Sequence, residues 1–329
     1  MFWLRSRKVY LNNGKIEKGG KLLKQVKKGV DFVMKVGEMP GGGKTVIETR
    51  DYSYVPGGKG ANAAVALARL GADSVFCAKL GNDNHAQRLR ALYVENGVDT
   101  RFIKTDRKAS TGLAAIVVED SGENRIIVYP GANMTMSDGD VEDAFTCLPD
   151  AVFLQLEIPD EAVIAATKFA KKQGIPVFLD AGPARVGYPL ERLEGPLEVI
   201  SPNESECFAL TGIMPNNTEN CLKAAIALQN KIACKYVVIK LGGRGAYIHD
   251  GRFSQLIPTY EGEVVDTTAA GDAFTSALTL EYLRTKDIIR AVRYAHAVGT
   301  IVVGRAGASS SLPTAAEVDT FIRMRGIQL

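Results

Sequence analysis

AVFLQLEIPDEAVIAATKFAKKQGIPVFLD, residues 151–180, carries the pattern that decides the fold. It opens with an apolar run, continues over 160–173 with apolar residues at helical spacing, and closes with a second apolar run, IPVFLD. Short, uninterrupted apolar runs are typical of strands buried on both faces of a sheet, and parallel strands need a crossover, usually a helix. The segment therefore predicts a strand, a helix and a second strand parallel to the first.

The same alternation extends in both directions along the chain. Further strands are expected at 74–81, 197–200 and 236–243. Further helices are expected at 84–96, 137–147, 203–211 and 217–233, the last two with Asn203 and Thr218 as N-caps. This rhythm predicts an α/β fold with a mostly parallel central sheet between two layers of helices. Ligands of such sheets bind beyond the carboxyl ends of the strands, so functional residues are expected there.

Two stretches, 32–55 and 110–130, interrupt this rhythm. Both alternate apolar and polar residues around Gly-rich or Asp-Ser-Gly turns, with no helix between. They predict a small antiparallel β sheet beside the main domain. Such a sheet can act as a lid that excludes water from a site, and its exposed edges can pair with a second copy. We expect both roles, and hence a homodimer formed through the lid.

Composition and charge narrow the class of protein. The chain has 329 residues, of which 46% are hydrophobic and 23% charged, typical of a soluble globular protein with one large α/β domain or two ordinary ones. Its apolar runs are too short to span a membrane, and its first residues lack the apolar core of a signal peptide, so a cytoplasmic location is expected. The five cysteines and three histidines show neither disulfide nor zinc spacing.

The amino-terminal segment differs in charge from the remainder. Residues 1–30 contain nine Lys and Arg against one acid, Glu17. Because this stretch has no regular amphipathic stripe and few aromatic residues, we expect 1–29 to form a solvated basic extension and assign it no nucleic-acid or membrane partner. The folded domain is expected to span 30–329.

VVDTTAAGDAF, residues 264–274, places small residues and one acid at the start of a helical pattern. The unpaired N–H groups and the dipole of a helix N-terminus favour an anion, and Ala269, Ala270 and Gly271 leave room for one. An acid beside a bound anion is unfavourable unless it removes a proton, and phosphoryl transfer needs both features. Asp272 is therefore a candidate base. Taken alone, an acid that complements the helix dipole explains Asp272 as readily.

VPGGKGANAAVALARLGA, residues 55–72, holds a second motif. Paired glycines let a polyhydroxylated ligand lie against the backbone, and Lys59 and Asn62 can hydrogen-bond its hydroxyl groups. A flexible turn before a core helix is the alternative. Neither this segment nor GGGKT at 41–45 is a Walker A loop, because the latter has Glu38 where the first glycine would stand.

GGKGANAAVALARLG and DTTAAGDAF together resemble the two signature segments of the ribokinase-like (PfkB) carbohydrate kinases, and the intervening features agree from Asp31 to the C-terminus. The GGKGAN form is most similar to that of ribokinases. The resemblance implies a ribokinase-like three-layer sandwich that transfers the γ-phosphoryl group of ATP to the 5-hydroxyl of D-ribose, with Mg²⁺ and with K⁺ as activator. A kinase for deoxyribose, another pentose, a sugar acid or a nucleoside remains open, as does a non-catalytic binding relative. A Rossmann oxidoreductase is excluded because no GxGxxG follows the first strand.

The resemblance also implies roles for individual residues. Asp272 would be the general base, and the amides of Ala269, Ala270 and Gly271 would hold the phosphoryl group in transfer. Besides Asp272, the sugar would be bound by Asp31, Gly58, Lys59, Asn62 and Glu157. The nucleotide and hydrated Mg²⁺ would be bound by Asn203, Glu206, Lys240, Gly242 and His296. The K⁺ ion would be held, largely by main-chain carbonyls, at Asp266, Thr268, Val302, Arg305, Gly307 and Ser311.

One stretch departs from the family pattern. The fold of the family begins with an apolar strand that leads to an asparagine two residues before the sugar-binding aspartate. Here KLLKQVKKGVDF, residues 21–32, is rich in lysine and has Gly29 at the asparagine position. Because a central parallel strand is nearly continuously apolar, the sequence does not predict the element that should position Asp31.

Overall fold

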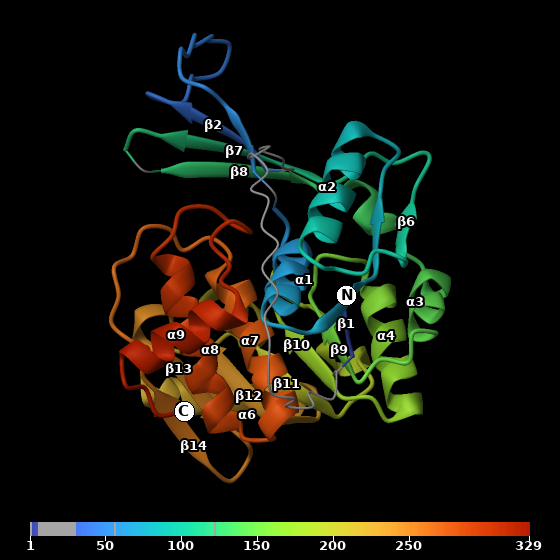
Figure 1. Cartoon of the computed structure of the whole chain (residues 1–329), viewed down its shortest axis with the longest axis vertical. Helices are drawn as coiled ribbons and strands as arrows, with labels where there is room; N and C mark the ends of the chain where they lie inside the picture. The colour runs from blue at the N-terminus through green and yellow to red at the C-terminus, as the bar shows by residue number, and fades with distance from the viewer. Residues whose placement is uncertain (1, 6–30, 56, 122) are drawn as a thin grey trace, which may run out of the picture.

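The computed structural model describes residues 2–5, 31–55, 57–121 and 123–329. A large α/β body carries a smaller sheet at one end (Figure 1). Most of the predicted basic extension, including Gly29, lies outside the described residues. Within the described part, no helix is both long and apolar enough to cross a membrane.

The main sheet has eight described strands in the order β14-β13-β12-β11-β10-β9-β1-β4. Its strands are β1 (Phe2–Arg5), β4 (Asp73–Phe76), β9 (Ala151–Leu154), β10 (Val177–Asp180), β11 (Leu197–Ser201), β12 (Cys234–Lys240), β13 (Ala246–His249) and β14 (Ser254–Ile257). Strands β9 to β12 are parallel, as the sequence predicted, while β13 runs antiparallel to both of its neighbours. All residues of β9 and β10 are buried, which explains their uninterrupted apolar sequences.

Strand β1 is the main departure from the expected organisation. It lies between β9 and β4 and runs antiparallel to both, with Trp3 opposite Val75 on one side and Val152 on the other. Residues Phe2–Arg5 therefore belong to the sheet and not to an extension. Their pairing satisfies backbone N–H and C=O groups of β9 and β4 that would otherwise form two open edges. A four-residue strand is too short for periodicity to reveal.

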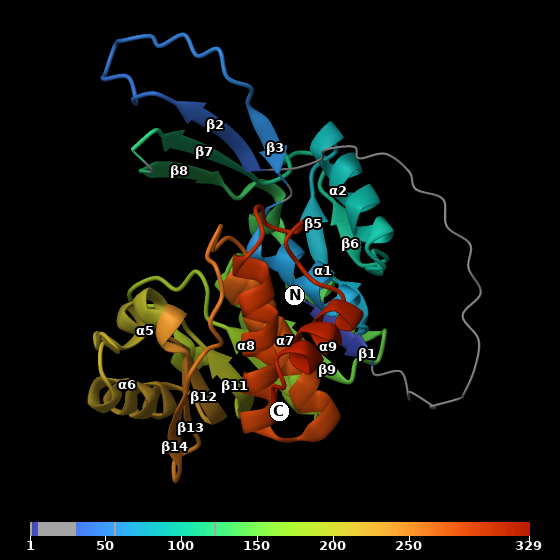
Figure 2. The ribbon, with the colours of Figure 1, turned by 60° about the vertical axis from the view of Figure 1, so that its left-hand side comes forward.

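Helices cover both faces of this sheet. They are α1 (Lys59–Arg69), α2 (Asn84–Glu95), α3 (Asp138–Phe145), α4 (Asp160–Gln173), α5 (Glu204–Thr211), α6 (Thr218–Lys231), α7 (Ala270–Thr285), α8 (Ile288–Val303) and α9 (Ala315–Met324), with short 3₁₀ turns η1 (Gly131–Thr135), η2 (Leu190–Arg192) and η3 (Gly242–Arg244). Figure 2 shows α5 and α6 set apart from α7, α8 and α9. Successive strand residues face opposite cores. Phe178 belongs to the cluster that contains residues of α1, α7 and α8, whereas Leu179 belongs to the cluster that contains residues of α3, α4 and α6. The predicted three-layer sandwich is confirmed.

Two local predictions need correction. The cap of α6 is Asn217, whose side chain accepts the N–H of Asn220 at 2.8 Å, and Thr218 is the first helical residue. The strand expected at 74–81 is split into β4 and β5 (Ala78–Leu80), and β5 pairs in parallel with β6 (Ile103–Thr105) in a separate two-stranded sheet. The prediction that Asn203 caps α5 is confirmed.

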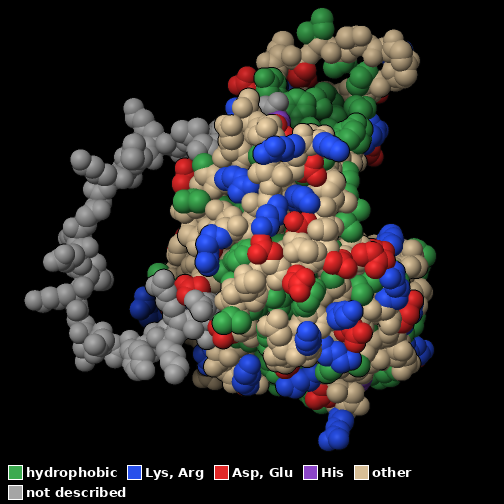
Figure 3. All heavy atoms as spheres, turned by 90° about the vertical axis from the view of Figure 1, so that its right-hand side faces the viewer, with side chains coloured by type: hydrophobic (Ala, Val, Ile, Leu, Met, Phe, Trp, Pro, Cys, Tyr) green, Lys and Arg blue, Asp and Glu red, His purple; other side chains and the backbone are tan. Residues whose placement is uncertain are grey.

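The predicted lid is a four-stranded sheet in the order β3-β2-β7-β8. It consists of β2 (Asp31–Val36), β3 (Ser53–Val55), β7 (Leu113–Glu119) and β8 (Asn124–Tyr129). The β2–β3 and β7–β8 pairs are antiparallel, but β2 and β7 are parallel, so the expectation of a fully antiparallel lid is wrong. The long connection through α1 and α2 allows parallel pairing, which no hairpin could provide. Hydrophobic side chains gather on the lid surface (Figure 3).

Candidate active site

Asp272 lies at the centre of the site, on the first turn of α7. Its side chain is buried, and its Oδ2 accepts a hydrogen bond of 2.9 Å from Nδ2 of Asn62 on α1. The Nζ of Lys59, at the start of α1, is 3.8 Å from Oδ1 of Asp272. The two sequence motifs, 210 residues apart, thus meet at one carboxylate.

The start of α7 is shaped by its N-cap residue, Ala269. This alanine has a left-handed backbone with φ of 62°, and among the described residues no side chain caps the helix. A left-handed alanine is strained, and such strain is concentrated at functional sites. Of the three predicted anion-hole amides, that of Ala270 donates to the carbonyl of Thr267 at 3.2 Å. An uncapped helix N-terminus beside a buried carboxylate is suited to hold an anion near a base.

Lys59 is surrounded by acids. Its backbone N–H donates to Oε2 of Glu157 at 3.0 Å. Burial lowers the pKa of the Lys59 ammonium, but the carboxylates of Asp272, Asp180, Glu206 and Glu157 outweigh burial and hold that pKa above its ordinary value. Lys59 therefore stays charged and balances the carboxylates that meet at the site.

Burial governs the ionisation of Asp272. Removal from water raises the pKa of its carboxyl to about 7, with Lys59 acting in the opposite direction and Asp180 adding to the rise. A carboxylate with a pKa near neutrality is suited to accept a proton and to release it again.

Asp31 packs against Gly57 on the sugar side of the predicted site. A Cβ atom on Gly57 would lie 1.9 Å from Oδ2 of Asp31, so only glycine fits there. Burial, aided by the nearby charge of Glu157, raises the pKa of Asp31 to about 6. The pKa of Glu157 is also raised, mainly by burial. Gly58 precedes α1 as its N-cap, with φ of 91°. The predicted sugar-binding residues are thus brought together.

Gln155 and Asp180, which the sequence analysis did not select, complete the polar cluster. The Nε2 of Gln155 donates to Oδ2 of Asp180 at 3.1 Å and to Oδ1 of Asp272 at 3.4 Å. The Oδ1 of Asp180 accepts Nζ of Lys240 at 2.6 Å. Each follows or ends an apolar strand run, and a polar residue at that place was the signal that could have identified them.

Two buried acceptor atoms in this cluster have no hydrogen-bond partner among the described residues. They are Oδ1 of Asn62 and Oε1 of Gln155. Buried polar atoms are nearly always hydrogen-bonded in folded proteins. Both atoms therefore suit a ligand that brings hydroxyl groups into the site.

Asn203 and Glu206, predicted on the nucleotide side, form a reciprocal capping box at the start of α5. The side chain of Asn203 accepts the N–H of Glu206 at 2.8 Å, and Oε2 of Glu206 accepts the N–H of Asn203 at 2.8 Å. The other oxygen of Glu206 extends towards the cluster: a Cβ on Gly182 would lie 2.4 Å from Oε1 of Glu206 and 3.2 Å from Cε of Lys59. Glu206 thus combines a capping role with a position at the site.

Gly242 and His296 differ in their surroundings. Gly242 begins the exposed turn η3 with φ of 55°. His296 is buried in α8, where its Nε2 is 3.1 Å from the carbonyl oxygen of Ile257 and its ring packs against Phe274 at 5.2 Å. Burial lowers the pKa of His296 to about 4, so the ring is neutral. His296 is a packed core residue in this structure.

Asp266 joins the two segments predicted for the cation. Its Oδ1 accepts the N–H of Thr268 at 2.8 Å and the Thr268 hydroxyl at 2.6 Å, and its Oδ2 accepts the N–H of Gly307 at 2.8 Å. The hydroxyl of Ser311 donates to the carbonyl of Ala308 at 2.7 Å, and the N–H of Arg305 to that of Val302 at 3.1 Å. Segments 266–268 and 302–311 therefore lie side by side, near the start of α7.

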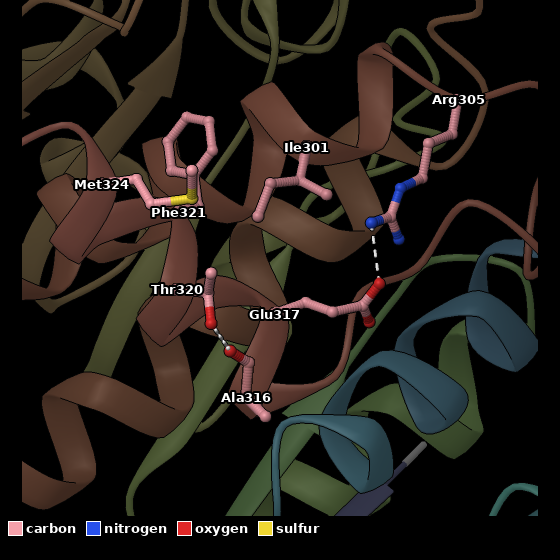
Figure 4. A pocket seen from close by; sticks show the side chains of 7 residues that line it. All are labelled: Ile301, Arg305, Ala316, Glu317, Thr320, Phe321 and Met324. Carbon is pink, nitrogen blue, oxygen red and sulfur yellow. Dashed lines mark hydrogen bonds and ion pairs between the residues drawn. The ribbon is translucent and has the colours of Figure 1, made fainter.

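The side chain of Arg305 turns towards α9. It pairs with Glu317 at 2.8 Å beside a surface hollow of about 480 Å³ that Ile301, Phe321 and Met324 help to line (Figure 4). The main chain of Arg305 is therefore the part that remains for a cation.

Comparison with known proteins identifies similarity over the part of the chain that contains these site residues. Residues 27–315 match the family model described as pfkB family carbohydrate kinase. The chain is 39% identical over 290 residues to a bifunctional ribokinase/ribose-5-phosphate isomerase A of Fructilactobacillus sanfranciscensis, covering 87% of this chain but only 53% of that protein. It is 35% identical to a ribokinase of Haemophilus influenzae, covering 83% of this chain and 89% of the relative.

The fold is also similar to that of a solved ribokinase structure. Arabidopsis thaliana ribokinase complexed with ribose and ATP superposes with a TM-score of 0.83 at 31% identity, covering 90% of this chain and 96% of the other. The family match spans most of the chain and contains every predicted site residue, from Asp31 to Ser311. The chain therefore belongs to the pfkB family of carbohydrate kinases.

Proposed function

We propose that this protein transfers the γ-phosphoryl group of ATP to the 5-hydroxyl of D-ribose. The observation that carries the proposal is the buried carboxylate of Asp272 at the uncapped start of α7, hydrogen-bonded at 2.9 Å to Asn62 of the sugar-side motif. The similarity to ribokinases, one of them solved with ribose and ATP, supports ribose as the acceptor.

The reaction follows from the charges in the site. Asp272 takes the proton of the attacking hydroxyl, whose oxygen forms a bond to the γ-phosphorus. The bond from that phosphorus to the bridging oxygen breaks, and ADP leaves with the electron pair. The N–H groups at the start of α7 and the ammonium of Lys59 stabilise the charge that spreads over the transferred group.

Sugar recognition is assigned to Asp31, Gly58, Lys59, Asn62 and Glu157. An ionised carboxylate only accepts hydrogen bonds, so Asp31 can hold two neighbouring hydroxyl groups when its proton is lost. The Oδ1 of Asn62, which has no hydrogen-bond partner in the described part of the chain, supplies a further acceptor. A site matched to hydroxyl groups in this way rejects analogues that lack one of them.

The oxygen donors of this site suit Mg²⁺ and K⁺. Mg²⁺ keeps most of its water and binds phosphates, so it needs few protein ligands, and Asn203 and Glu206 are the residues assigned to it. When bound, Mg²⁺ neutralises phosphate charge during transfer. The K⁺ site is assigned to the segments joined by Asp266, where hydrogen bonds outweigh burial and hold the pKa of this carboxyl below its ordinary value.

A homodimer formed through the lid, in the cytoplasm, completes the proposal. Strand β8 lies at one edge of the lid sheet, where Ile127 and Tyr129 are both 57% exposed. Apolar side chains on an exposed edge strand favour pairing with another copy. Analytical ultracentrifugation should find a dimer, and Ile127→Lys with Tyr129→Lys should yield a monomer; a monomeric unmodified protein would contradict this part.

The decisive experiment measures ADP release with ribose, deoxyribose, other pentoses, sugar acids and nucleosides, each with and without K⁺. Ribose should give the highest kcat/KM. A higher kcat/KM with another acceptor would replace ribose as the proposed substrate. Absence of turnover with every acceptor in the panel would overturn the kinase proposal in favour of a binding role.

A further inference from the structure

A buried ion pair joins the ends of two strands in the site. Lys240 ends β12 and Asp180 ends β10, on either side of β11, and their Nζ and Oδ1 atoms are 2.6 Å apart. Their side chains are only 11% and 2% exposed. Neither residue has a part in the proton transfer described above.

Stability alone does not explain this pair. Removing two charges from water offsets most of their attraction, and replacing a buried ion pair by apolar residues is often neutral or stabilising. Apolar residues could therefore close the carboxyl ends of β10 and β12 without loss of stability. The charges therefore point to a ligand.

The position of Lys240 indicates the charge of that ligand. Its ammonium lies 3.8 Å from the point that a Cβ on Gly271 would occupy, at the start of α7, and it is 3.3 Å from Oγ1 of Thr275 one turn later. A cation beside the positive end of a helix dipole is unfavourable unless an anion joins them. Among the described residues, only Asp180 and Thr275 accept hydrogen bonds from this ammonium, which leaves its third N–H group for an anion.

Asp180 is itself held in place from a second direction. The Nε2 of Gln155 donates to the other oxygen of Asp180 and, at 3.4 Å, to the base Asp272. Lys240, Asp180, Gln155 and Asp272 thus form one buried chain of contacts. This chain fixes the ammonium relative to the carboxylate that receives the proton.

We propose that Asp180 is a positioning residue that holds Lys240 where its ammonium contacts the γ-phosphoryl group of ATP during transfer. This inference rests on the proposed kinase function. As the hydroxyl oxygen bonds to the γ-phosphorus and ADP leaves with the electron pair, the proton goes to Asp272. The ammonium of Lys240 stabilises the charge on the non-bridging oxygens.

The test separates this role from a purely structural pair by comparing Lys240→Met, Asp180→Asn and the double variant Asp180→Leu/Lys240→Met. The apolar double variant should keep the unfolding midpoint of the unmodified protein, since no charge is left unpaired. In both variants that lack Lys240, kcat should fall about 10²-fold, the usual scale for a lost transition-state donor. Asp180→Asn, which keeps shape but not charge, should lower kcat by about tenfold with little change in the sugar KM.

Nucleotide binding gives a readout that does not depend on the acceptor sugar. Calorimetry should find that Lys240→Met weakens the binding of ATP by about tenfold and leaves that of ADP unchanged, because the contact is with the γ-phosphoryl group. The matched control is Lys235→Met, which breaks the exposed pair with Glu198 (3.0 Å) at the opposite end of β12 and should leave both affinities and kcat unchanged.

Two results would overturn the inference. One is a double variant with near-normal kcat, which would show that the pair only joins strands. The other is an equal loss of ATP and ADP affinity in Lys240→Met. If the unmodified protein bound ATP more tightly than ADP through Lys240 but phosphorylated no sugar, the substrate proposal would fail while the Lys240 contact stood.

Discussion

Asn62 on α1 donates its side-chain amide to the carboxylate of Asp272 on α7 over 2.9 Å, where both residues are buried. This single contact joins the sugar-side motif to the phosphoryl-side motif. It orients the carboxylate and, as a hydrogen bond to the charged form, lowers the pKa that burial has raised. The same contact therefore fixes the position of the base and contributes to its proton affinity, beside burial, Lys59 and Asp180.

Replacing Asp272 by asparagine keeps the size of the side chain and removes the proton acceptor. We expect kcat to fall by about 10² or more, with the affinities for ATP and the sugar preserved. Steady-state kinetics and calorimetry check this, with Asp319→Asn on the exposed face of α9 as the control. Near-normal turnover in Asp272→Asn would remove it from the role of base.

The pH dependence of kcat/KM should show an acid limb near pH 7. The pKa of Asp272 is raised to about 7 in the free protein, and only its ionised form, which predominates above that pH, can accept the proton. Lys59 lowers this pKa and Asp180 raises it. The limb should therefore move to higher pH in Lys59→Met and to lower pH in Asp180→Asn. Shifts in the same direction would contradict the assignment of the limb to Asp272.

Gly57→Ala should impair sugar binding. The added Cβ would lie 1.9 Å from Oδ2 of Asp31 and would displace this carboxylate. We expect the sugar KM to rise roughly tenfold, equivalent to about 1.4 kcal/mol of binding free energy, with little change in the KM for ATP. Gly42→Ala in the lid, where a Cβ meets nothing within 4 Å, is the matched control. An unchanged KM in Gly57→Ala would argue against Asp31 as a sugar ligand.

Omitting K⁺ should lower kcat, and Asp266→Ala should abolish this dependence. Asp266 accepts the N–H groups of Thr268 and Gly307, each at 2.8 Å, and so holds together the two segments assigned to the cation. Activity titrated with K⁺ against choline at constant ionic strength measures the effect. Asp287→Ala, at the cap of α8, should keep the full K⁺ response. An undiminished K⁺ response in Asp266→Ala would place the cation elsewhere.

Much of the fold was accessible from local patterns. The strand and helix of 151–173 and the strand after them appear as β9, α4 and β10, because the spacing of apolar residues reports burial directly. The prediction of Asn203 as the N-cap of α5 was equally local, because a cap depends on residues close to it in the sequence. Thr218 was displaced as a cap because two neighbouring polar residues compete for that position, and only Asn217 reaches the N–H of Asn220.

Some residues of the site could be predicted from the sequence, and others could not. Asp272, Lys59 and Asn62 stand in sequence motifs whose residue types suit their chemistry, and the structure brings them within hydrogen-bond or ion-pair distance. Gln155 and Asp180 had no such motif, since each becomes part of the site only through a partner on another strand or helix. His296 was selected by resemblance, whereas the structure buries it in the core.

By itself the sequence determined the alternating strands and helices, the residues with reactive side chains, and the small residues that leave room at the start of α7, because each depends on neighbours along the chain. Tertiary structure alone decided the place of β1 between β9 and β4, the parallel pairing of β2 with β7, and the chain of contacts from Lys240 to Asp272. These depend on backbone pairing and charge contacts between segments far apart in the chain. The spacing of apolar residues along the chain does not predict these pairings and contacts, because they arise only when the sheet has formed and water has been excluded.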